Sequence, residues 1–399
     1  MRDIYELRMP RTIIYGERSF TKVGEQALRF GKKCLVVSDK VMVDLGYVKM
    51  CIHYLEKVGI ECLSYVDIET EPTDKYVKEA LDIVKKEQCD IIIALGGGSC
   101  IDTAKAVAVL ATNRDDISDY MNNKKLVNNA PLPLIAIPTT AGTGSEATDV
   151  TVITNTTNNV KMMIKQPAFM PEVAIVDPIL TVSSPKSITA ATGLDALTHA
   201  LEAYISKKAH PFTNQLALSA IKLIVENIFE AYHNGKNINA RNNMIYASML
   251  AGIAFSNSSV CLVHGMSRPI GAIFHVPHGI SNAMLLPVIL KYTQSSCINR
   301  LAEIGRFLYP HYSNLKDEEL SQKVVSTIIG LCEGLNIKNI ESWGINEAEY
   351  NKVLVKMAKD ALISGSPANN PRVPTEDEII DLYREAFIFE YPSVKEGTP

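Results

Sequence analysis

The strongest constraint on the fold is a change of hydrophobic pattern about halfway along the chain. Up to about residue 184, short apolar runs of strand length alternate with amphipathic stretches of helical spacing. Beyond it, long helical patterns follow one another without convincing strands. Strand–helix alternation predicts a parallel sheet covered by helices. We therefore expect an α/β domain over residues 1–184 and an all-helical domain over residues 185–399.

Each expected element can be placed by its local pattern. Five apolar runs predict strands at residues 32–39, 61–67, 89–99, 131–140 and 172–178. Amphipathic stretches predict helices at residues 41–59 and 73–88, the second capped by Thr73 and Asp74. Two period-two segments around a polar turn predict a hairpin from residue 147 to residue 165. In the second half, long helices are expected at residues 187–206, 214–233, 242–257, 320–335, 346–362 and 376–387.

Composition excludes several classes of protein. The formal net charge of -4 gives no basic excess, which argues against nucleic acid and anionic membrane as partners. No apolar run reaches the roughly 18 residues needed to span a bilayer, and the charged residues 1–16 lack the apolar core of a signal peptide. The eight cysteines are scattered without a CxxC pair, which argues against a disulfide framework and a thiolate zinc site. We expect a cytoplasmic protein.

A glycine-rich loop ends the strand predicted at residues 89–99. Gly96, Gly97 and Gly98 allow positive φ and a close approach of the backbone to a ligand. Ser99 with Asp102 matches the S-x-x-D pattern of a capping box, and the helix start that it would mark favours a phosphate. The alternative is a tight turn with a good cap and no ligand. The loop is not GxGxxG, so the usual dinucleotide fingerprint is absent.

Two further features favour a nucleotide. Asp39 ends an earlier strand, where parallel sheets place their ligands. Its carboxylate could accept both hydroxyls of an adenosine ribose and would repel a 2′-phosphate, which favours NAD over NADP. Asp39 could equally be a helix N-terminal residue without a ligand. A second polar loop, "PTTAGTGSEAT" at residues 138–148, carries four threonines and could complete a pyrophosphate or nicotinamide cradle.

Four residues suggest a metal site. Asp195 and His199 stand four apart in a predicted helix and so share one face. In isolation such a pair usually means a hydrogen bond or a solvated face. His264 in apolar surroundings and His278 in "HVPHG" strengthen the metal interpretation. One carboxylate and three imidazoles suit Fe(II), Zn or a similar ion and leave a further position for a substrate oxygen.

At this point the chain resembles a known family. The motifs GGGSxxDxAK, PTTAGTGSE, GLDALTHALEAY and HGMxxPxGAxxxxPHG, in this order and spacing, are similar to those of the iron-containing (group III) alcohol dehydrogenases. The resemblance covers nearly the whole chain. It implies a Rossmann-like N-terminal domain, a helical C-terminal domain in the dehydroquinate-synthase-like arrangement, and a catalytic metal in the cleft between them.

The resemblance also implies roles for individual residues. The metal ligands would be Asp195, His199, His264 and His278. The pyrophosphate would lie on the glycine loop, at Gly97, Gly98 and Ser99. The rest of the cofactor site would be lined by Thr139, Thr140, Thr148 and Lys161, and Asp39 favours NAD.

The expected activity is hydride transfer between NAD(H) and a small alcohol or aldehyde, a primary alcohol or diol, with the divalent ion as Lewis acid. Fe(II) follows from the family, although zinc stands higher in the affinity order. The chain departs from many members, which read HGMAHP, by placing Arg268 at the second histidine, and arginine cannot exchange a proton near neutral pH. Arg268 could clamp an anionic group of the substrate, or contact cofactor phosphate or a neighbouring acid. His275 is a candidate proton relay, or else a wall of the cleft or a partner of a ligand.

Other classes remain as alternatives. A lyase of the dehydroquinate-synthase type needs a basic phosphate-binding pocket, whereas the motifs supply one arginine. A glycerol-dehydrogenase-like zinc enzyme on the same fold, and a protein that senses metal or nucleotide without turnover, are the other two. Family members are often dimers, so we expect a homodimer.

Overall fold

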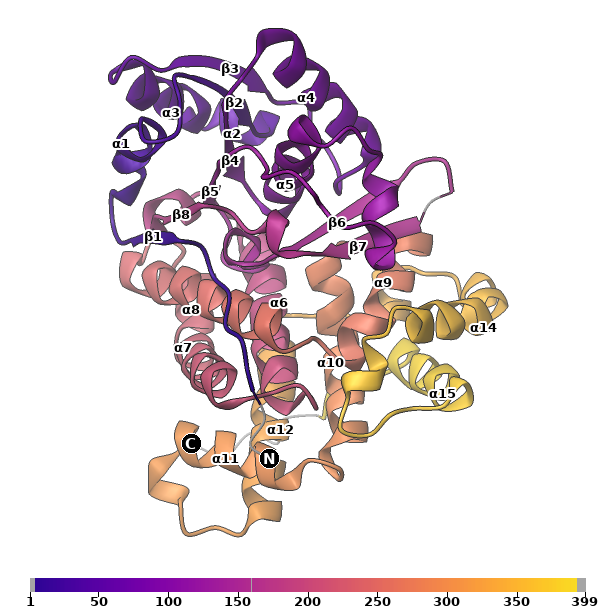
Figure 1. Cartoon of the computed structure of the whole chain (residues 1–399). Helices are drawn as coiled ribbons and strands as arrows, with labels where there is room; N and C mark the ends of the chain where they lie inside the picture. The colour runs from indigo at the N-terminus through magenta and orange to yellow at the C-terminus, as the bar shows by residue number, and fades with distance from the viewer. Residues whose placement is uncertain (1–3, 159, 393–399) are drawn as a thin grey trace.

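The computed structural model describes residues 4–158 and 160–392, and Figure 1 shows an α/β part followed by a helical part. The main sheet is built within residues 12–176, and helices account for the regular structure after residue 186. The prediction that an α/β region is followed by a helical region is confirmed.

The main sheet contains six strands, all parallel. They are β1 (Thr12–Tyr15), β2 (Lys33–Val37), β3 (Glu61–Tyr65), β4 (Ile91–Gly96), β5 (Leu134–Pro138) and β8 (Val173–Val176). Their order across the sheet is β1-β8-β5-β4-β2-β3. All five predicted strands are present. Strand β1 was not predicted, because it is four residues long and has no fully buried residue.

Helices cover both faces of this sheet. In β4, every residue is buried, with Ile92 in the apolar cluster of one face and Ile93 in that of the other. The first face is covered by α4 (Asp74–Glu87) and α5 (Gly98–Thr112), the second by α1 (Val23–Ala27) and α3 (Tyr47–Glu56). Burial on both faces explains why these strands read as continuous apolar runs.

Two helix starts show how local chemistry sets the bounds. The single helix predicted at residues 41–59 is wrong: α2 (Lys40–Asp44) and α3 are separate, because Gly46 between them has φ 78°. Apolar spacing continues across the break and so hides it. The predicted cap of α4 is confirmed for Thr73, whose hydroxyl accepts from the Tyr76 amide at 3.3 Å. Asp74 lies in the first turn and accepts instead from the Thr156 amide at 3.1 Å.

The predicted hairpin is confirmed as a separate antiparallel sheet of β6 (Val150–Asn155) and β7 (Val160–Lys165). It lies between the main sheet and the helical part in Figure 1, and β7 contacts α9 (Leu262–Phe274). Because side chains alternate along a strand, Lys161 and Met163 share one face of β7, and Met162 points to the other.

The helical part contains all six predicted helices. Its helices after residue 186 are α6 (Lys186–Ile205), α7 (Pro211–His233), α8 (Ile238–Asn257), α9, α10 (His278–Gln294), α11 (Ile298–Leu308), α12 (Asp317–Gly334), α13 (Ile340–Trp343), α14 (Glu347–Ile363) and α15 (Glu376–Phe387). Helix α6 is buried along most of its length, so it forms the centre of this part. No single helix among the described residues is long and apolar enough to cross a membrane; α8 and α9 meet that test only together, as a pair bent by 102°.

At Gly144 the second polar loop meets α8 backbone to backbone. Gly144 has φ +61°, and a Cβ added there would lie 2.6 Å from the Cα of Gly252. A Cβ added at Gly252 would lie 2.6 Å from the Gly144 carbonyl oxygen. Neither position accepts a side chain without moving the loop away from the helix.

Candidate active site

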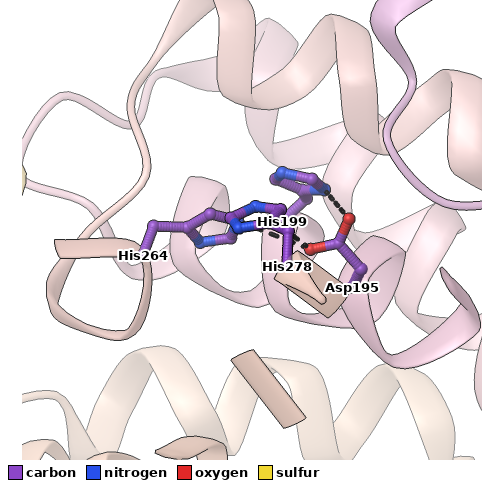
Figure 2. Close-up of side chains that lie close together, drawn as sticks. All are labelled: Asp195, His199, His264 and His278. Atoms are coloured by element: carbon purple, nitrogen blue, oxygen red, sulfur yellow. Dashed lines mark ion pairs between the residues drawn. The ribbon is translucent and has the colours of Figure 1, made fainter. Parts of the chain in front are cut away.

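The four predicted metal ligands lie together (Figure 2). Asp195 and His199 come from α6, His264 from α9 and His278 from the first residue of α10. One donor atom of each lies within 4.8 Å of all the others. The Nε2 atoms of His264 and His278 are 3.7 and 3.8 Å from one Asp195 oxygen, and His199 Nδ1 is 3.9 Å from the other. Ligands at bond lengths near 2.1 Å stand roughly 3.4 Å apart, so the cluster is close to the size of a one-ion site.

Two local features bring these residues together: one buried face of α6 and the turn between α9 and α10. Asp195 and His199 are one turn apart on the buried face of α6. His264 stands near the start of α9, which ends at His275 in the left-handed region with φ 56°. Pro277 then precedes α10, so His278 returns to the same place fourteen residues after His264.

Ring stacking fixes the orientation of His199. Its ring lies 4.3 Å from that of Phe255 with an interplanar angle of 16°, and 4.4 Å from that of His264 with an angle of 27°. A ring stacked on two sides keeps its plane, so its Nδ1 stays directed at Asp195.

Glu202 supports the cluster from behind, and sequence reasoning missed it. Its carboxylate accepts from His264 Nδ1 at 2.7 Å and from the Val263 and Cys261 amides at 2.6 and 2.8 Å. A carboxylate on one ring nitrogen leaves the other nitrogen, Nε2, for a metal. The signal was present in the sequence, because Asp195, His199 and Glu202 follow the i, i+4, i+7 spacing of one helix face.

Asn282 was also missed. Its Nδ2 lies 2.7 Å from Asp195 Oδ1, 3.1 Å from His264 Nε2 and 3.2 Å from His278 Nε2. Its Oδ1 is buried without a hydrogen-bond partner. Asn282 stands one turn after His278 on α10, and that spacing is the only trace of its role in the sequence.

The electrostatics of the cluster fit a divalent cation. Burial lowers the pKa of His199 to about 4 and that of His278 to about 3, so both rings are neutral at pH 7. Burial opposes ionisation of Asp195, but the three surrounding histidines, His264 through a hydrogen bond, favour its carboxylate form and bring its pKa below the ordinary value. His199 Nδ1 is buried and has no hydrogen-bond partner. Burial opposes protonation of His264, but its hydrogen bonds with Asp195 and Glu202 raise its pKa. A carboxylate, two neutral imidazoles, the His264 ring and an unused lone pair form a donor set suited to Fe(II) or Zn.

The predicted capping box at the glycine loop is wrong. Helix α5 begins at Gly98 with Gly97 as its cap, and Ser99 lies inside the first turn. Asp102 accepts instead from the Ser145 hydroxyl at 2.6 Å and the Val152 amide at 2.9 Å, because it faces the second loop and the hairpin. With no side chain capping it, the helix start keeps amide donors for an anion.

The two polar loops lie side by side. A Cβ at Gly97 would lie 3.6 Å from the Thr140 hydroxyl, and one at Gly98 would lie 2.8 Å from Thr143 Cγ2. Gly98 therefore has no room for a side chain unless Thr143 shifts. The predicted residues Gly97, Gly98 and Thr140 thus belong to one surface, and Thr139 is buried beside it.

Asp39 lies next to the same glycine loop. One of its oxygens accepts from the Met42 amide at 2.9 Å and so caps α2. The other oxygen accepts from Cys100 Sγ at 3.4 Å and would lie 3.4 Å from a Cβ at Gly96. Asp39 is therefore a helix cap that lies beside the glycine loop.

Thr148 lies behind the loop, where its hydroxyl accepts from Lys105 Nζ at 2.9 Å. Lys105, another residue that sequence reasoning missed, is itself buried. It also donates to the Ser145 hydroxyl at 2.9 Å and the Val150 carbonyl at 2.7 Å. Thr148 thus helps to fix the shape of the loop from inside.

Lys161 and Arg268 lie where β7 faces α9. Lys161 forms an ion pair with Glu71, and its Nζ lies 3.0 Å from the position of a Cβ at Gly271. Arg268 donates to the Ser366 hydroxyl at 3.0 Å and to Met163 Sδ at 3.2 Å.

His275 is exposed. Its ring makes no hydrogen bond within residues 4–158 and 160–392.

A surface hollow of about 590 Å³ lies away from these residues. Val160 and Met162, on the face of β7 opposite to Lys161, line part of it. The other lining residues are Ser118, Asp119, Met121, Lys124, Lys125, Asn155 and Asn158. It contains none of the predicted site residues.

Comparison with known proteins identifies the family. Residues 10–178 match the model of the iron-containing alcohol dehydrogenases, and residues 189–387 match its C-terminal domain. The chain is 38% identical to 1,3-propanediol dehydrogenase of Klebsiella pneumoniae over 96% of this chain and 99% of that protein. The crystal structure of a 1,3-propanediol oxidoreductase superposes with a TM-score of 0.92 at 37% identity, covering 96% of this chain and all of that one. Sulfoacetaldehyde reductase from Bifidobacterium kashiwanohense, in complex with NAD+, gives 0.86 at 29% identity, covering 98% and 100%. The chain therefore belongs to the iron-containing alcohol dehydrogenase family.

Proposed function

We propose that the protein transfers a hydride between NAD(H) and a small primary alcohol or diol, or the corresponding aldehyde, with a divalent ion at Asp195, His199, His264 and His278. One observation carries the proposal: four donor atoms of a suitable chemical set meet in a buried cluster. Family membership supports the reaction class. The relatives named above act on a diol and on an aldehyde that bears a sulfonate, so they leave the charge of the substrate open.

The ion held at this cluster would supply a Lewis acid toward the alcohol oxygen. The chain's residues prepare the place. Glu202 directs Nε2 of His264 inward, and stacking on Phe255 holds the ring of His199. The side chain of His278 is 35% exposed, so the cluster is reached from its side. Fe(II) is the family's ion, and zinc in a glycerol-dehydrogenase-like enzyme is the second candidate.

NAD would supply the hydride acceptor, and the two polar loops would hold it. The amides at the start of α5, at Gly98 and Ser99, suit the pyrophosphate. Thr139 and Thr140 lie beside this helix start, and Lys161 lies toward the metal cluster. Asp39 would accept from the ribose hydroxyls and repel a 2′-phosphate, so we propose NAD rather than NADP as the cofactor.

The proton needs an exit, and Arg268 cannot provide it because its guanidinium stays protonated. We propose His275 as the relay. Its exposure at the corner between α9 and α10, three residues before His278, supports this role. Replacing His275 with Ala should then lower kcat at neutral pH and change the pH profile, while metal content stays at the wild-type level.

The decisive experiment is an anaerobic NADH-linked screen of small alcohols, diols and ω-hydroxy acids with the iron and zinc forms. Asp195→Ala and His199→Ala should lose both metal and turnover. Full activity of a metal-free Asp195→Ala protein would refute the proposal. If the enzyme with bound NAD converts a phosphorylated substrate without net formation of NADH, the dehydroquinate-synthase-type lyase is favoured.

We further propose a cytoplasmic homodimer with a domain boundary between residues 184 and 185. The eight cysteines are all free, as a reducing compartment requires. Sedimentation at several concentrations checks the dimer, and limited proteolysis checks whether the chain is first cut near the boundary.

A further inference from the structure

Arg268 starts from the same helix face as a metal ligand. It follows His264 by four residues on α9, which places the two side chains one turn, about 6 Å, apart on one face. Its two hydrogen-bond partners, the Ser366 hydroxyl and the Met163 thioether, are both neutral. A guanidinium has five N–H donors, so several remain for another acceptor.

The charge of Arg268 has no direct counterion. Among the described residues no carboxylate forms an ion pair with it. Glu202 acts on it at longer range, but that carboxylate already accepts from His264 and from the Val263 and Cys261 amides. Burial lowers the pKa of Arg268 to about 10, which leaves it charged at neutral pH. A desolvated cation without a partner is costly, so a site that retains one is suited to an anionic ligand.

Arg268 lies on the side of α9 that faces β7. Met163, which it contacts, shares a face of β7 with Lys161. Lys161 in turn lies against Gly271, three residues after Arg268, and its charge contributes to lowering the pKa of His278. Arg268 keeps partial solvent exposure. Lys161 forms an ion pair with Glu71. Of these two cations, only Arg268 lacks a counterion among the described residues.

We propose that Arg268 binds a carboxylate at the end of the substrate remote from the reacting carbon, so that the preferred substrates are short ω-hydroxy acids and the corresponding ω-oxo acids. The planar guanidinium suits the two oxygens of a carboxylate. The inference rests on the proposed function and leaves its balance unchanged: the hydroxy acid and NAD+ give the oxo acid, NADH and a proton.

The test compares an acid with its neutral isostere. The iron-loaded enzyme is assayed with 4-hydroxybutanoate and 4-hydroxybutanamide, and with their three- and five-carbon analogues, for wild type, Arg268→Gln and Arg268→Lys. Wild type should prefer the acid by roughly 10- to 100-fold in kcat/KM, as a charge-assisted hydrogen bond gives. Arg268→Gln should remove that preference and change the amide rate by less than about 3-fold. Arg268→Lys should keep part of it. Arg384→Gln, which removes an exposed cation on α15, should retain the wild-type ratio.

A binding measurement separates this inference from the proposed function. Butanoate and propanesulfonate should raise the melting temperature of the wild type in the presence of NAD+, butanamide should not, and Arg268→Gln should lose the response. Three results would overturn the inference: no preference for the acid in wild type, an equal loss on acid and amide in Arg268→Gln, or a rise in KM for NAD+ with the acid preference intact. If no alcohol is turned over but the carboxylate effect persists, the proposed function fails and the anion site stands.

Discussion

Two cations, Lys105 buried in the α/β part and Arg268 partly buried in the helical part, have opposite surroundings. Lys105 donates to two hydroxyls and a carbonyl, and the carboxylates of Asp102, Glu146 and Asp149 act on it. Arg268 has one hydroxyl, one thioether and no ion pair among the described residues. We therefore expect the compensated charge of Lys105 to hold structure and the uncompensated charge of Arg268 to be available to a ligand.

The largest expected effect is at Lys105. Replacing it with Met leaves Asp102 without its cation, while Asp149 keeps Lys165, and should cost roughly 3–5 kcal/mol of the free energy of unfolding. Urea denaturation at pH 7 measures it. Lys356→Met, which removes an exposed lysine of α14, should have no measurable effect. If Lys105→Met lowers the free energy of unfolding by less than about 1 kcal/mol, the ion pair and hydrogen bonds of Lys105 do not contribute to stability as proposed.

The pH dependence of stability at Glu146 tests whether Lys105 neutralises the charge of this neighbouring carboxylate. Burial raises the pKa of Glu146 from 4.5 to about 7, and its Oε1 has no hydrogen-bond partner. Because the folded pKa is the higher one, the stability that the protonated group contributes is present below pH 4.5 and is lost as the pH rises to about 7. The loss should be about 3 kcal/mol in all. Glu146→Gln should not show it, so denaturation at pH 5 and pH 8 should separate the two proteins only at pH 8. Parallel profiles would show that Lys105 already neutralises Glu146.

A further test asks whether Glu202 orients His264 or compensates the charge of Arg268. If it orients His264, Glu202→Gln should weaken metal binding by about 10- to 100-fold, measured by competition with a chelator. Glu226→Gln, on the exposed face of α7, is the matched control. Unchanged metal affinity would instead make Glu202 a counterion of Arg268 and would weaken the contrast with Lys105.

The smallest effect is expected for the stability of Arg268→Met. No ion pair is lost, so the free energy of unfolding without ligand should change by less than about 1 kcal/mol or increase. Denaturation of the substrate-free protein measures it. A loss as large as that of Lys105→Met would assign Arg268 a structural charge.

The four-residue cluster could be predicted because its signals are local. Helical spacing links Asp195 to His199, and the histidines His264 and His278 stand in a motif of fixed length. Glu202 follows the same helical spacing, so it could have been predicted from the sequence as well. Asn282 was not, because its contact with three ligands depends on how α10 packs against α6 and α9.

Each error has its own physical cause. The capping box at Ser99 failed because Asp102 found better partners in a distant loop, which local sequence does not show. Helices α9 and α10 were not predicted because Pro269 and Pro287 resemble breaks, yet both stand inside helices. Strand β1 is too short and too exposed to give a pattern.

The contact of Gly144 with Gly252 restricts how this sequence can diverge. Most packing defects can be repaired by shrinking a neighbour, but here both partners already have the smallest side chain. A substitution at either position therefore has no compensating substitution at the other. The pair should stay fixed while the loop and the helix around it accumulate changes, and a sequence library randomised at these two positions should return only glycine at both.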